Sequence, residues 1–315
     1  MSYLHTYGPA GDPVTRLNWG LIAISCAVSI IIGLLVLLAV FRKRPPASPD
    51  AQGRMPLGRG GNGLPWIYIG VGISTVVLFA VGIWNAVTLA AVSEPDRKPA
   101  ITVEITAHQW WWEARYRGDS PTQIFVTANE IHIPVGQPVL FKLASDDVIH
   151  SFWIPQLGGK TDVIPGQVNL AWLQADKPGT YRGQCGEYCG AQHAHMAMYV
   201  VAEEPEKFAQ WRADQLANAA APSETQAQLG HDAFIQNCSV CHTVRGTMAQ
   251  GRLGPDLTHL MSRGTIAAGL LDNNEGSLNG WIANPQALKP GTHMPRILLQ
   301  PEELHDVVAY LQTLK

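Results

Sequence analysis

Charged side chains are scarce in this chain. Asp, Glu, Lys and Arg make up 15% of its 315 residues, and the formal net charge is −3. A chain of this composition lacks the excess of basic residues that is typical of nucleic-acid-binding proteins. Its length is sufficient for two or three domains.

Cysteine is also rare, with five in the chain. Cys26 lies in an apolar segment, where we interpret it as a small buried hydrophobic residue. The other four form two close pairs, Cys185 with Cys189 and Cys238 with Cys241. Such spacings are typical of metal or haem binding rather than of a disulfide framework. If both pairs serve such groups, no pair remains for a structural disulfide.

Two segments, 17–41 and 60–93, carry no charged residue at all. Each is longer than the ~20 apolar residues that a membrane-spanning helix needs. We therefore predict two transmembrane helices, at about 17–41 and 64–92. A cleaved signal peptide is the alternative for the first segment, but the apolar run is too long and no basic region precedes it.

The stretch between these helices is basic. It contains a single acid, Asp50, and five basic residues: Arg42, Lys43, Arg44, Arg54 and Arg59. The positive-inside rule places such a short loop in the cytoplasm. Both termini and everything after residue 93 are then expected on the periplasmic or outer side of a bacterial inner (plasma) membrane.

The pattern changes after the second helix. Short β-type runs at 101–107, 123–127, 138–144 and 168–173 are separated by turn signals rich in Pro and Gly. Many short strands at this spacing predict a sandwich or Greek-key barrel, which we assign to residues 94–204. Residues 205–224 are expected to form a short helix and a linker. The runs in 225–315 are helical, and the last one has Pro at its start, Glu in its first turn and Lys at its end.

The sequence CGEYCGAQHAHM at 185–196 combines two cysteines with His193 and Met196, and His150 lies upstream. Two thiolates, two imidazoles and a thioether are soft ligands that select copper over hard cations. Two thiolates on one loop can bridge two coppers and share an electron between them, whereas a blue copper site needs a single cysteine. Zinc is the alternative, since two Cys and two His also form a closed tetrahedral site. The methionine argues against zinc.

DDVIHSFWIPQLGGKTDVIPG (146–166), together with CGEYCGAQHAHM, resembles subunit II of cytochrome c oxidase and its CuA centre. The resemblance covers roughly residues 15–205 and implies a cupredoxin-like barrel. It implies copper ligation by six groups, with Glu187 acting through its backbone carbonyl: His150, Cys185, Glu187, Cys189, His193 and Met196. It also implies that the Glu187 carboxylate binds magnesium at the contact with subunit I. His195 matches no ligand position.

AHQWWWEARY at 107–116 is a second signature of the family. By this resemblance Trp110 is the residue where electrons enter, whereas we interpret Trp111 and Trp112 as packing residues. Many members of the family carry a glutamate near the cytoplasmic start of the second helix, at the mouth of a proton channel. The segment 60–93 has no acid, so that contribution is absent or is supplied otherwise.

Cys238-Ser-Val-Cys241-His242 is a c-type haem attachment motif. Its thiols bond to the haem vinyl groups and His242 becomes the proximal iron ligand; a zinc knuckle or a redox pair is the alternative. The sixth ligand should be soft and should come from the opposite face. Met294, in the turn KPGTHMP, is our prediction for this ligand. Met261 is the weaker alternative, and Met248 is too close to His242 in sequence.

The C-terminal segment resembles class I cytochrome c, an all-helical fold. The resemblance depends on Gly230 and Phe234, GPDL at 254–257, the HMP motif and Tyr310. It implies that the first and last helices cross at Gly230 and Tyr310. It also implies that the carbonyl of Pro255 orients His242.

A CuA domain fused to a cytochrome c domain resembles subunit II of a caa(3)-type haem-copper oxidase, a multidomain membrane protein. The resemblance implies that electrons pass from a donor to haem c, then to binuclear copper, then to haem a of subunit I. Oxygen is reduced to water there, coupled to proton pumping. The implied partners are subunits I and III, cytochrome c or another donor and the lipid bilayer, but no nucleic acid. A CuA-containing nitric oxide reductase subunit and a membrane-anchored copper-delivery protein are the alternatives.

Overall fold

The computed structural model describes residues 2–43, 63–118 and 120–315. The chain divides into two compact units: one is Pro13–Ser93, and the other combines Met1–Asp12 with Glu94–Lys315. Most of the basic loop that carries the topology prediction, residues 44–62, lies outside the described residues.

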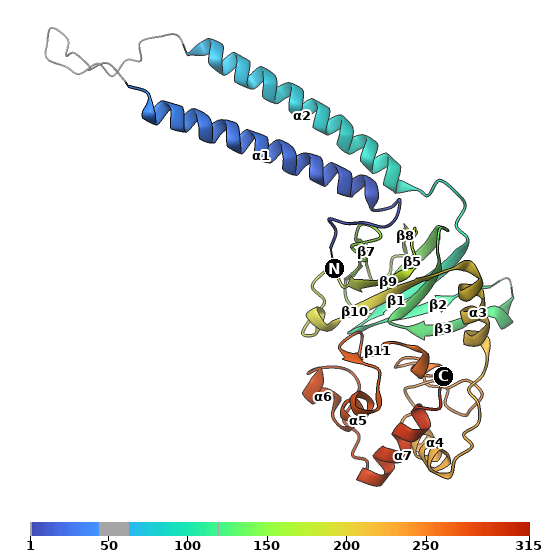
Figure 1. Cartoon of the computed structure of the whole chain (residues 1–315). Coiled ribbons are helices and arrows are strands. Elements are labelled where there is room, and N and C mark those ends of the chain that lie inside the picture. Colours follow the sequence, from blue (N-terminus) through green and yellow to red (C-terminus); the bar gives the residue numbers. More distant parts are fainter. Residues whose placement is uncertain (1, 44–62, 119) are drawn as a thin grey trace, which may run out of the picture. The chain divides into compact units, whose positions relative to one another are not determined.

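Two long helices, α1 (Asp12–Phe41) and α2 (Leu64–Ser93), form the N-terminal part of the chain (Figure 1). Both are long and apolar enough to cross a membrane, which confirms the predicted pair of apolar helices. They meet where the ring of Trp84 lies against Gly20, so closely that a Cβ at Gly20 would lie 2.3 Å from that ring. A small residue at this point lets the two helices approach each other.

The second unit begins with a β-sandwich. A five-stranded sheet has the order β3-β2-β1-β5-β8, and a three-stranded sheet has the order β4-β10-β9. The first sheet consists of β1 (Ile101–His108), β2 (Trp111–Tyr116), β3 (Phe125–Ala128), β5 (Val139–Ser145) and β8 (Asn169–Leu173). The second consists of β4 (Glu130–Pro134), β9 (Gly179–Gln184) and β10 (Ala197–Glu203). The predicted β domain is confirmed.

Alternating burial explains why these segments form strands. In β1, Val103 and Ile105 are fully buried and their neighbours are partly exposed, as a half-buried strand requires. β5 runs parallel to β1 and buries Phe141 beside Val103 and Leu143 beside Ile105. The inner faces of the two sheets supply the core between them, as in other sandwiches.

Shorter elements complete the β domain. The hairpin of β6 (His150–Phe152) and β7 (Thr161–Val163) begins with His150, and η2 (His193–His195) is a single 3-10 turn that carries His193. A further 3-10 turn, η1, spans Pro121–Gln123.

Helix α3 (Pro205–Leu216) forms the first part of the segment expected to be the linker. It packs on the sandwich, where Phe208 is buried and the ring of Trp211 stacks on His132 with 4.1 Å between centroids. His132 in turn hydrogen-bonds to the carboxylates of Glu130 and Glu203. This part of the segment is therefore held against the β domain.

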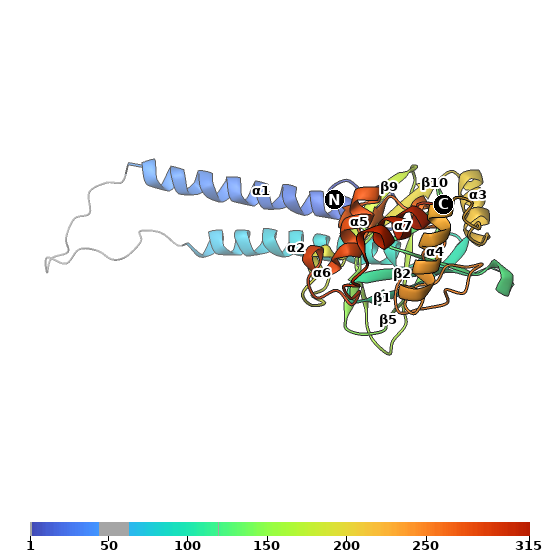
Figure 2. The same ribbon diagram turned by 90° about the horizontal axis from the view of Figure 1, so that it is seen from below.

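The C-terminal part, residues 225–315, is helical apart from one small hairpin and is called the helical domain. Its elements are α4 (Thr225–Asn237), η3 (Leu260–Ser262), β11 (Thr265–Ile266), β12 (Leu271–Asp272), α5 (Glu275–Ala283), α6 (Pro285–Leu288) and α7 (Pro301–Leu311). Helices α4 and α7 lie against each other in both views (Figures 1 and 2). A Cβ at Gly230 would lie 1.8 Å from the carbonyl oxygen of Asp306 and 2.9 Å from the Cβ of Tyr310. The crossing of the first and last helices at Gly230 and Tyr310 is therefore confirmed.

We expect Gly230→Ala to destabilise the C-terminal domain by about 1–3 kcal/mol, because the added methyl group forces α4 away from the backbone of α7. Gly280→Ala is the matched control, since its Cβ would meet Leu288 at an ordinary 3.8 Å within α5. Calorimetry of the detergent-solubilised chain measures both variants. Equal stability of the two would show that the close crossing is not required.

Candidate copper and haem sites

Two backbone hydrogen bonds close the loop at 185–196, which joins β9 to β10. The amide of Cys185 donates to the carbonyl of Met196 over 3.0 Å, so the two ends of the loop lie side by side. The amide of Gly186 donates to the carbonyl of Ser151 over 2.9 Å. This second bond holds the start of β6, and with it His150, against the loop. The β ladder thus brings together groups that are far apart in sequence.

Sulfur and nitrogen atoms form a connected set inside this loop. The Sγ atoms of Cys185 and Cys189 lie 3.7 Å apart. The Nδ1 of His150 lies 3.9 Å from the Sγ of Cys185. On the other side, the Sγ of Cys189 lies 3.7 Å from the Nδ1 of His193 and 3.8 Å from the Sδ of Met196. The structure therefore brings together all five side chains that the sequence singled out.

Burial favours soft-metal chemistry at this set. His150 and Met196 are fully buried, both cysteines are 2% exposed, and His193 is partly exposed. The hydrogen bond between the two thiols lowers the pKa of Cys185 to about 3 and raises the pKa of Cys189. The pair thus readily gives up one proton, and a metal ion that replaces the second proton meets two thiolates. Such soft donors fit copper.

The arrangement does not suit a single tetrahedral zinc ion. Ligands at ~2.0–2.3 Å from one ion keep all donor atoms within about 4 Å of one another. The described donors that all lie within 4.8 Å of one another are His150, Cys185 and Cys189, and His193 is not among them. The two imidazoles approach different thiols, as expected when two metal ions share both sulfurs.

Asp147 orients His150, and sequence reasoning missed it. Its Oδ1 accepts a hydrogen bond from the Nε2 of His150 over 2.7 Å, which leaves Nδ1 facing the thiols. Burial raises the pKa of Asp147, but hydrogen bonds from His150 and from the amides of Val148 and Gln109 lower it overall. A carboxylate behind an imidazole is the usual outer partner of a histidine that binds metal. The acid three residues before His150 was the available signal.

Glu187 and His195 lie at the edge of the loop. The carbonyl oxygen of Glu187 is 3.2 Å from the Sγ of Cys185, whereas its side chain is exposed. The Nδ1 of His195 contacts the side chain of Gln192 over 2.7 Å, and the ring is exposed. The backbone carbonyl of Glu187 therefore lies beside the sulfur of Cys185, and its role as a copper ligand stays a prediction.

The C-x-x-C-H motif follows the end of α4. The amide of Cys238 still donates to the helix, at the carbonyl of Phe234. The amides of Cys241 and His242 both donate to the carbonyl of Cys238, over 3.1 and 3.0 Å. One tight turn therefore holds the two thiols and the imidazole close together. Burial raises the pKa of Cys238 to about 11.

His242 is prepared to bind a metal through one nitrogen. Its Nδ1 donates to the carbonyl of Pro255 over 2.8 Å, as the resemblance implied. Burial lowers the pKa of the ring, so it is neutral and its Nε2 keeps a free lone pair. A Cβ at Gly254 would lie 2.6 Å from the Cε1 of His242, so the backbone there packs directly on the ring. These features fit the proximal ligand of a haem iron.

The three methionines considered for the sixth ligand have different surroundings. Met294 is partly buried, and its own backbone carbonyl accepts a hydrogen bond from the side chain of Gln286 over 2.8 Å. Met248 is 84% exposed. Met261 packs against the core of the helical domain.

Trp110 lies where the β domain meets the helical domain. Its Nε1 donates to the carbonyl of Cys189 over 2.9 Å. From the helical domain, the ring of His293 lies 5.9 Å from the ring of Trp110, and the Nζ of Lys289 donates to the carbonyl of Trp110 over 2.9 Å. The side chain of Trp110 is only 7% exposed as a result. Sequence reasoning missed Lys289, because nothing in the local pattern marks it.

The other two tryptophans of the motif serve packing. Trp112 is fully buried in the sandwich, and Trp111 stacks on His108 with 4.4 Å between centroids. This agrees with the packing role that we expected for both.

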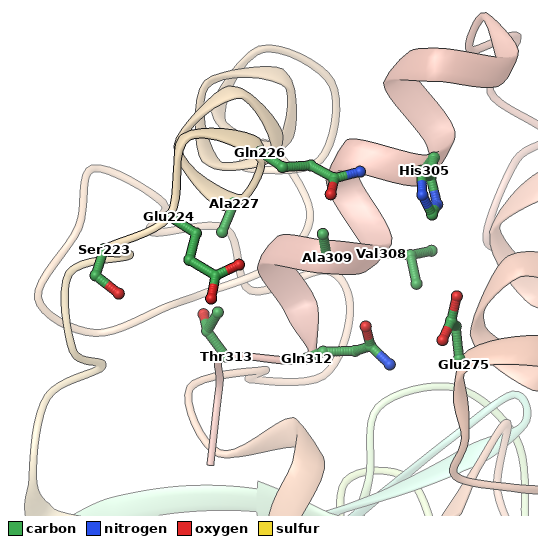
Figure 3. Close-up of a pocket in the computed structure, with 10 residues that line it drawn as sticks. All are labelled: Ser223, Glu224, Gln226, Ala227, Glu275, His305, Val308, Ala309, Gln312 and Thr313. Atoms are coloured by element: carbon green, nitrogen blue, oxygen red, sulfur yellow. The ribbon is translucent and has the colours of Figure 1, made fainter.

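A cavity of about 330 Å³ lies among α4, α5 and α7 (Figure 3). The ten described residues that line it include none of the predicted ligands: Ser223, Glu224, Gln226, Ala227, Glu275, His305, Val308, Ala309, Gln312 and Thr313.

Comparison with known proteins agrees with these two sites. The family described as cytochrome c oxidase subunit II, periplasmic domain, matches residues 118–203, and the family described as cytochrome c matches residues 227–315. The two matches contain the copper-type and the haem-type donors, respectively.

Three relatives are similar over most of this chain. Cytochrome c oxidase subunit 2 of Alkalihalophilus pseudofirmus is 35% identical over 301 residues, which are 93% of this chain and 85% of that protein. The protein of the same name from Bacillus sp. strain PS3 is 34% identical over 69% of this chain and 63% of its own length. That of Bacillus subtilis is 29% identical over 80% of this chain and 74% of its own length.

We expect Gly254→Ala to lower the yield of haem-loaded chain and to shift the haem absorption bands. Its methyl group would push the ring of His242 away from the carbonyl of Pro255. Gly280→Ala, which has room for its methyl group, should leave both unchanged. Absorption spectra of the purified chains measure the effect. A normal spectrum for Gly254→Ala would show that the ring keeps its position without this contact.

Proposed function

Because this chain belongs to the cytochrome c oxidase subunit II family and carries a cytochrome c domain, we propose that it accepts electrons at haem c and delivers them through binuclear CuA to haem a of subunit I. Oxygen reduction to water in subunit I, coupled to proton pumping, is the reaction that it serves. The observation that carries the proposal is the contact at Trp110, where the loop before Met294 meets the loop that holds Cys189. One chain thus holds the loop before Met294 and the loop of Cys189 in contact through Trp110.

The loop at 185–196, here called the copper loop, would hold two copper ions. Cys185 and Cys189 would bridge them, His150 and His193 would bind one ion each, and the Sδ of Met196 and the carbonyl of Glu187 would complete the set. The 3.7 Å between the sulfurs and the position of each imidazole beside a different thiol support this assignment. The exposed carboxylate of Glu187 would bind magnesium at the contact with subunit I.

The helical domain would hold one haem. Cys238 and Cys241 would form its thioether bonds, His242 would bind the iron through Nε2, and Met294 would bind it from the other face. When bound, the copper ions and the haem iron supply reversible one-electron redox chemistry. Hydrogen bonds within the chain orient these ligands. Asp147 accepts one from His150, and the carbonyl of Pro255 accepts one from His242. The side chain of Gln286 donates one to the carbonyl of Met294.

Trp110 would connect the two sites. Its indole N–H is bonded to the carbonyl of a copper-loop cysteine, and its ring faces His293, the residue before Met294. The short separations along this series of groups support its role as the point of electron entry to CuA. An external donor, cytochrome c or another small redox protein, would then deliver electrons to the helical domain rather than to Trp110.

The two apolar helices anchor the chain in a membrane, and the redox domains lie on its outer side. We propose the bacterial inner membrane as the location, and contact with subunits I and III there. Helix α2 contains no acidic residue, so its contribution to proton uptake would be absent or supplied by another group.

We expect Cys189→Ser to abolish the shared electron between two coppers, because a single remaining thiolate cannot bridge both ions in one mixed-valence unit. Electron paramagnetic resonance and copper stoichiometry of the oxidised chain measure this. Cys26→Ser in α1, which lies outside the loop, is the matched control and should keep the signal. A hyperfine pattern from one copper nucleus in the unmutated chain would contradict the binuclear assignment. A single copper per chain would instead favour copper delivery.

We expect Met294→Ala to keep the haem covalently bound but to lower its reduction potential, by a sizeable part of the ~0.8 V range that axial ligands span. Turnover with the protein donor should fall, and turnover with a strong small reductant should persist. Redox titration measures the potential, with Met248→Ala and Met261→Ala as controls. If Met261→Ala lowers the potential instead, Met261 is the axial ligand.

A further inference from the structure

Lys289 is a charged residue that is buried in the helical domain. Its side chain is 2% exposed, and among the described residues no acidic side chain forms an ion pair with it. Lysine is almost never buried to this extent without a partner of opposite charge. Removing an ammonium group from water is costly unless hydrogen bonds replace the lost hydration. The position of Lys289 therefore calls for a specific set of acceptors.

Two backbone carbonyls supply these bonds, and they belong to different domains. The Nζ of Lys289 donates to Trp110 in the β domain and to Ala267 in the helical domain, each over 2.9 Å. The ammonium thus ties the two domains together through main-chain atoms. Burial lowers the pKa of Lys289 to about 7, and the side chain can donate to both carbonyls in either protonation state.

The turn that contains Ala267 and Ala268 has a strained backbone. Ala267 and Ala268 both have positive φ angles, 55° and 61°, which cost energy for a residue with a Cβ. The carbonyl of Ala267 binds Lys289, and the carbonyl of Ala268 accepts a hydrogen bond from the amide of Ala197 in the β domain over 3.0 Å. Both strained residues therefore make contacts that hold the domains together.

The residues after Lys289 continue along Trp110. The carbonyl of Pro290 accepts a hydrogen bond from Gln192 in the copper loop over 2.7 Å. A Cβ at Gly291 would lie 3.7 Å from the ring of Trp110, and the ring of His293 follows. Inside the helical domain, Gln286 binds this loop at the amide of Gly291 and at the carbonyls of Thr292 and Met294. Lys289 and Pro290 therefore tie the start of this loop to the β domain, whereas Gln286 holds its end at Met294 within the helical domain.

We propose that Lys289 is a positioning residue that locks the helical domain onto Trp110 and thereby sets the rate of electron transfer between the two redox sites. The proposal rests on the proposed function. The helical domain then acts as a permanently docked relay and not as a mobile tethered carrier. Because the helical domain covers Trp110, an external redox protein can dock only on the helical domain.

The test is Lys289→Met in the complete oxidase, because methionine keeps an apolar stem and donates no hydrogen bond. A ruthenium complex injects an electron photochemically into the haem, and the absorbance of copper reports its arrival. We expect the transfer rate to fall several-fold, because electron tunnelling weakens with each additional ångström between the haem and copper sites. The haem potential, the haem spectrum and the copper resonance signal should stay unchanged, which a general loss of structure would not allow.

Lys207→Met, at an exposed position on α3, is the matched control and should transfer at the normal rate. A normal rate for Lys289→Met would overturn the proposal. If Lys289→Met loses haem or copper, Lys289→Gln decides. Its shorter amide still donates, so an intermediate rate supports the proposal and a normal rate overturns it. If the unmutated complex shows no transfer from haem to copper, the proposed function itself fails, whatever Lys289 does.

Discussion

The arrangement of the redox residues depends on one hydrogen bond, from the amide of Cys185 to the carbonyl of Met196. It extends the β9–β10 ladder and closes the loop, so that its first and last predicted ligands lie beside each other. A rigid ladder on a buried sandwich can hold such a loop in place where a free segment could not. Because the neighbouring amide of Gly186 binds Ser151, the same closure also brings His150 to the sulfurs.

The helical domain extends this constraint. Trp110 binds the carbonyl of Cys189 on one side and meets the loop at 289–293 on the other, so the surface of the copper loop serves as the docking surface of the haem domain. The hydrogen bonds between the two domains include one between backbone groups, from Ala197 to Ala268, and others that involve a side chain, such as that from Lys289 to Trp110. Their directionality favours one docked position over many. Lys289 adds a buried donor at the centre of this contact.

The linker between the domains also contributes to a single arrangement. Helix α3 is held to the sandwich by Phe208 and by the stack of Trp211 on His132. After it, the carbonyl of Ala217 accepts a hydrogen bond from the ring of His259 in the helical domain. A tether that is bound at both ends raises the effective concentration of one redox site near the other and narrows the distances they sample.

The sequence by itself determined the two apolar helices, the β domain and the helical domain, and it supplied the predicted ligands of both sites. These features follow from local signals: uninterrupted apolar runs, alternating burial, and motifs whose ligands lie close together, such as Cys185 to Met196 and Cys238 to His242. The tertiary structure alone decided which groups orient those ligands and how the domains meet. Asp147 lay only three residues from His150, but its role depends on a rotamer that spacing does not specify. Lys289 is separated from Trp110 by 179 positions, and its acceptors are backbone carbonyls that every residue possesses, so no side-chain pattern could reveal that contact before folding formed it.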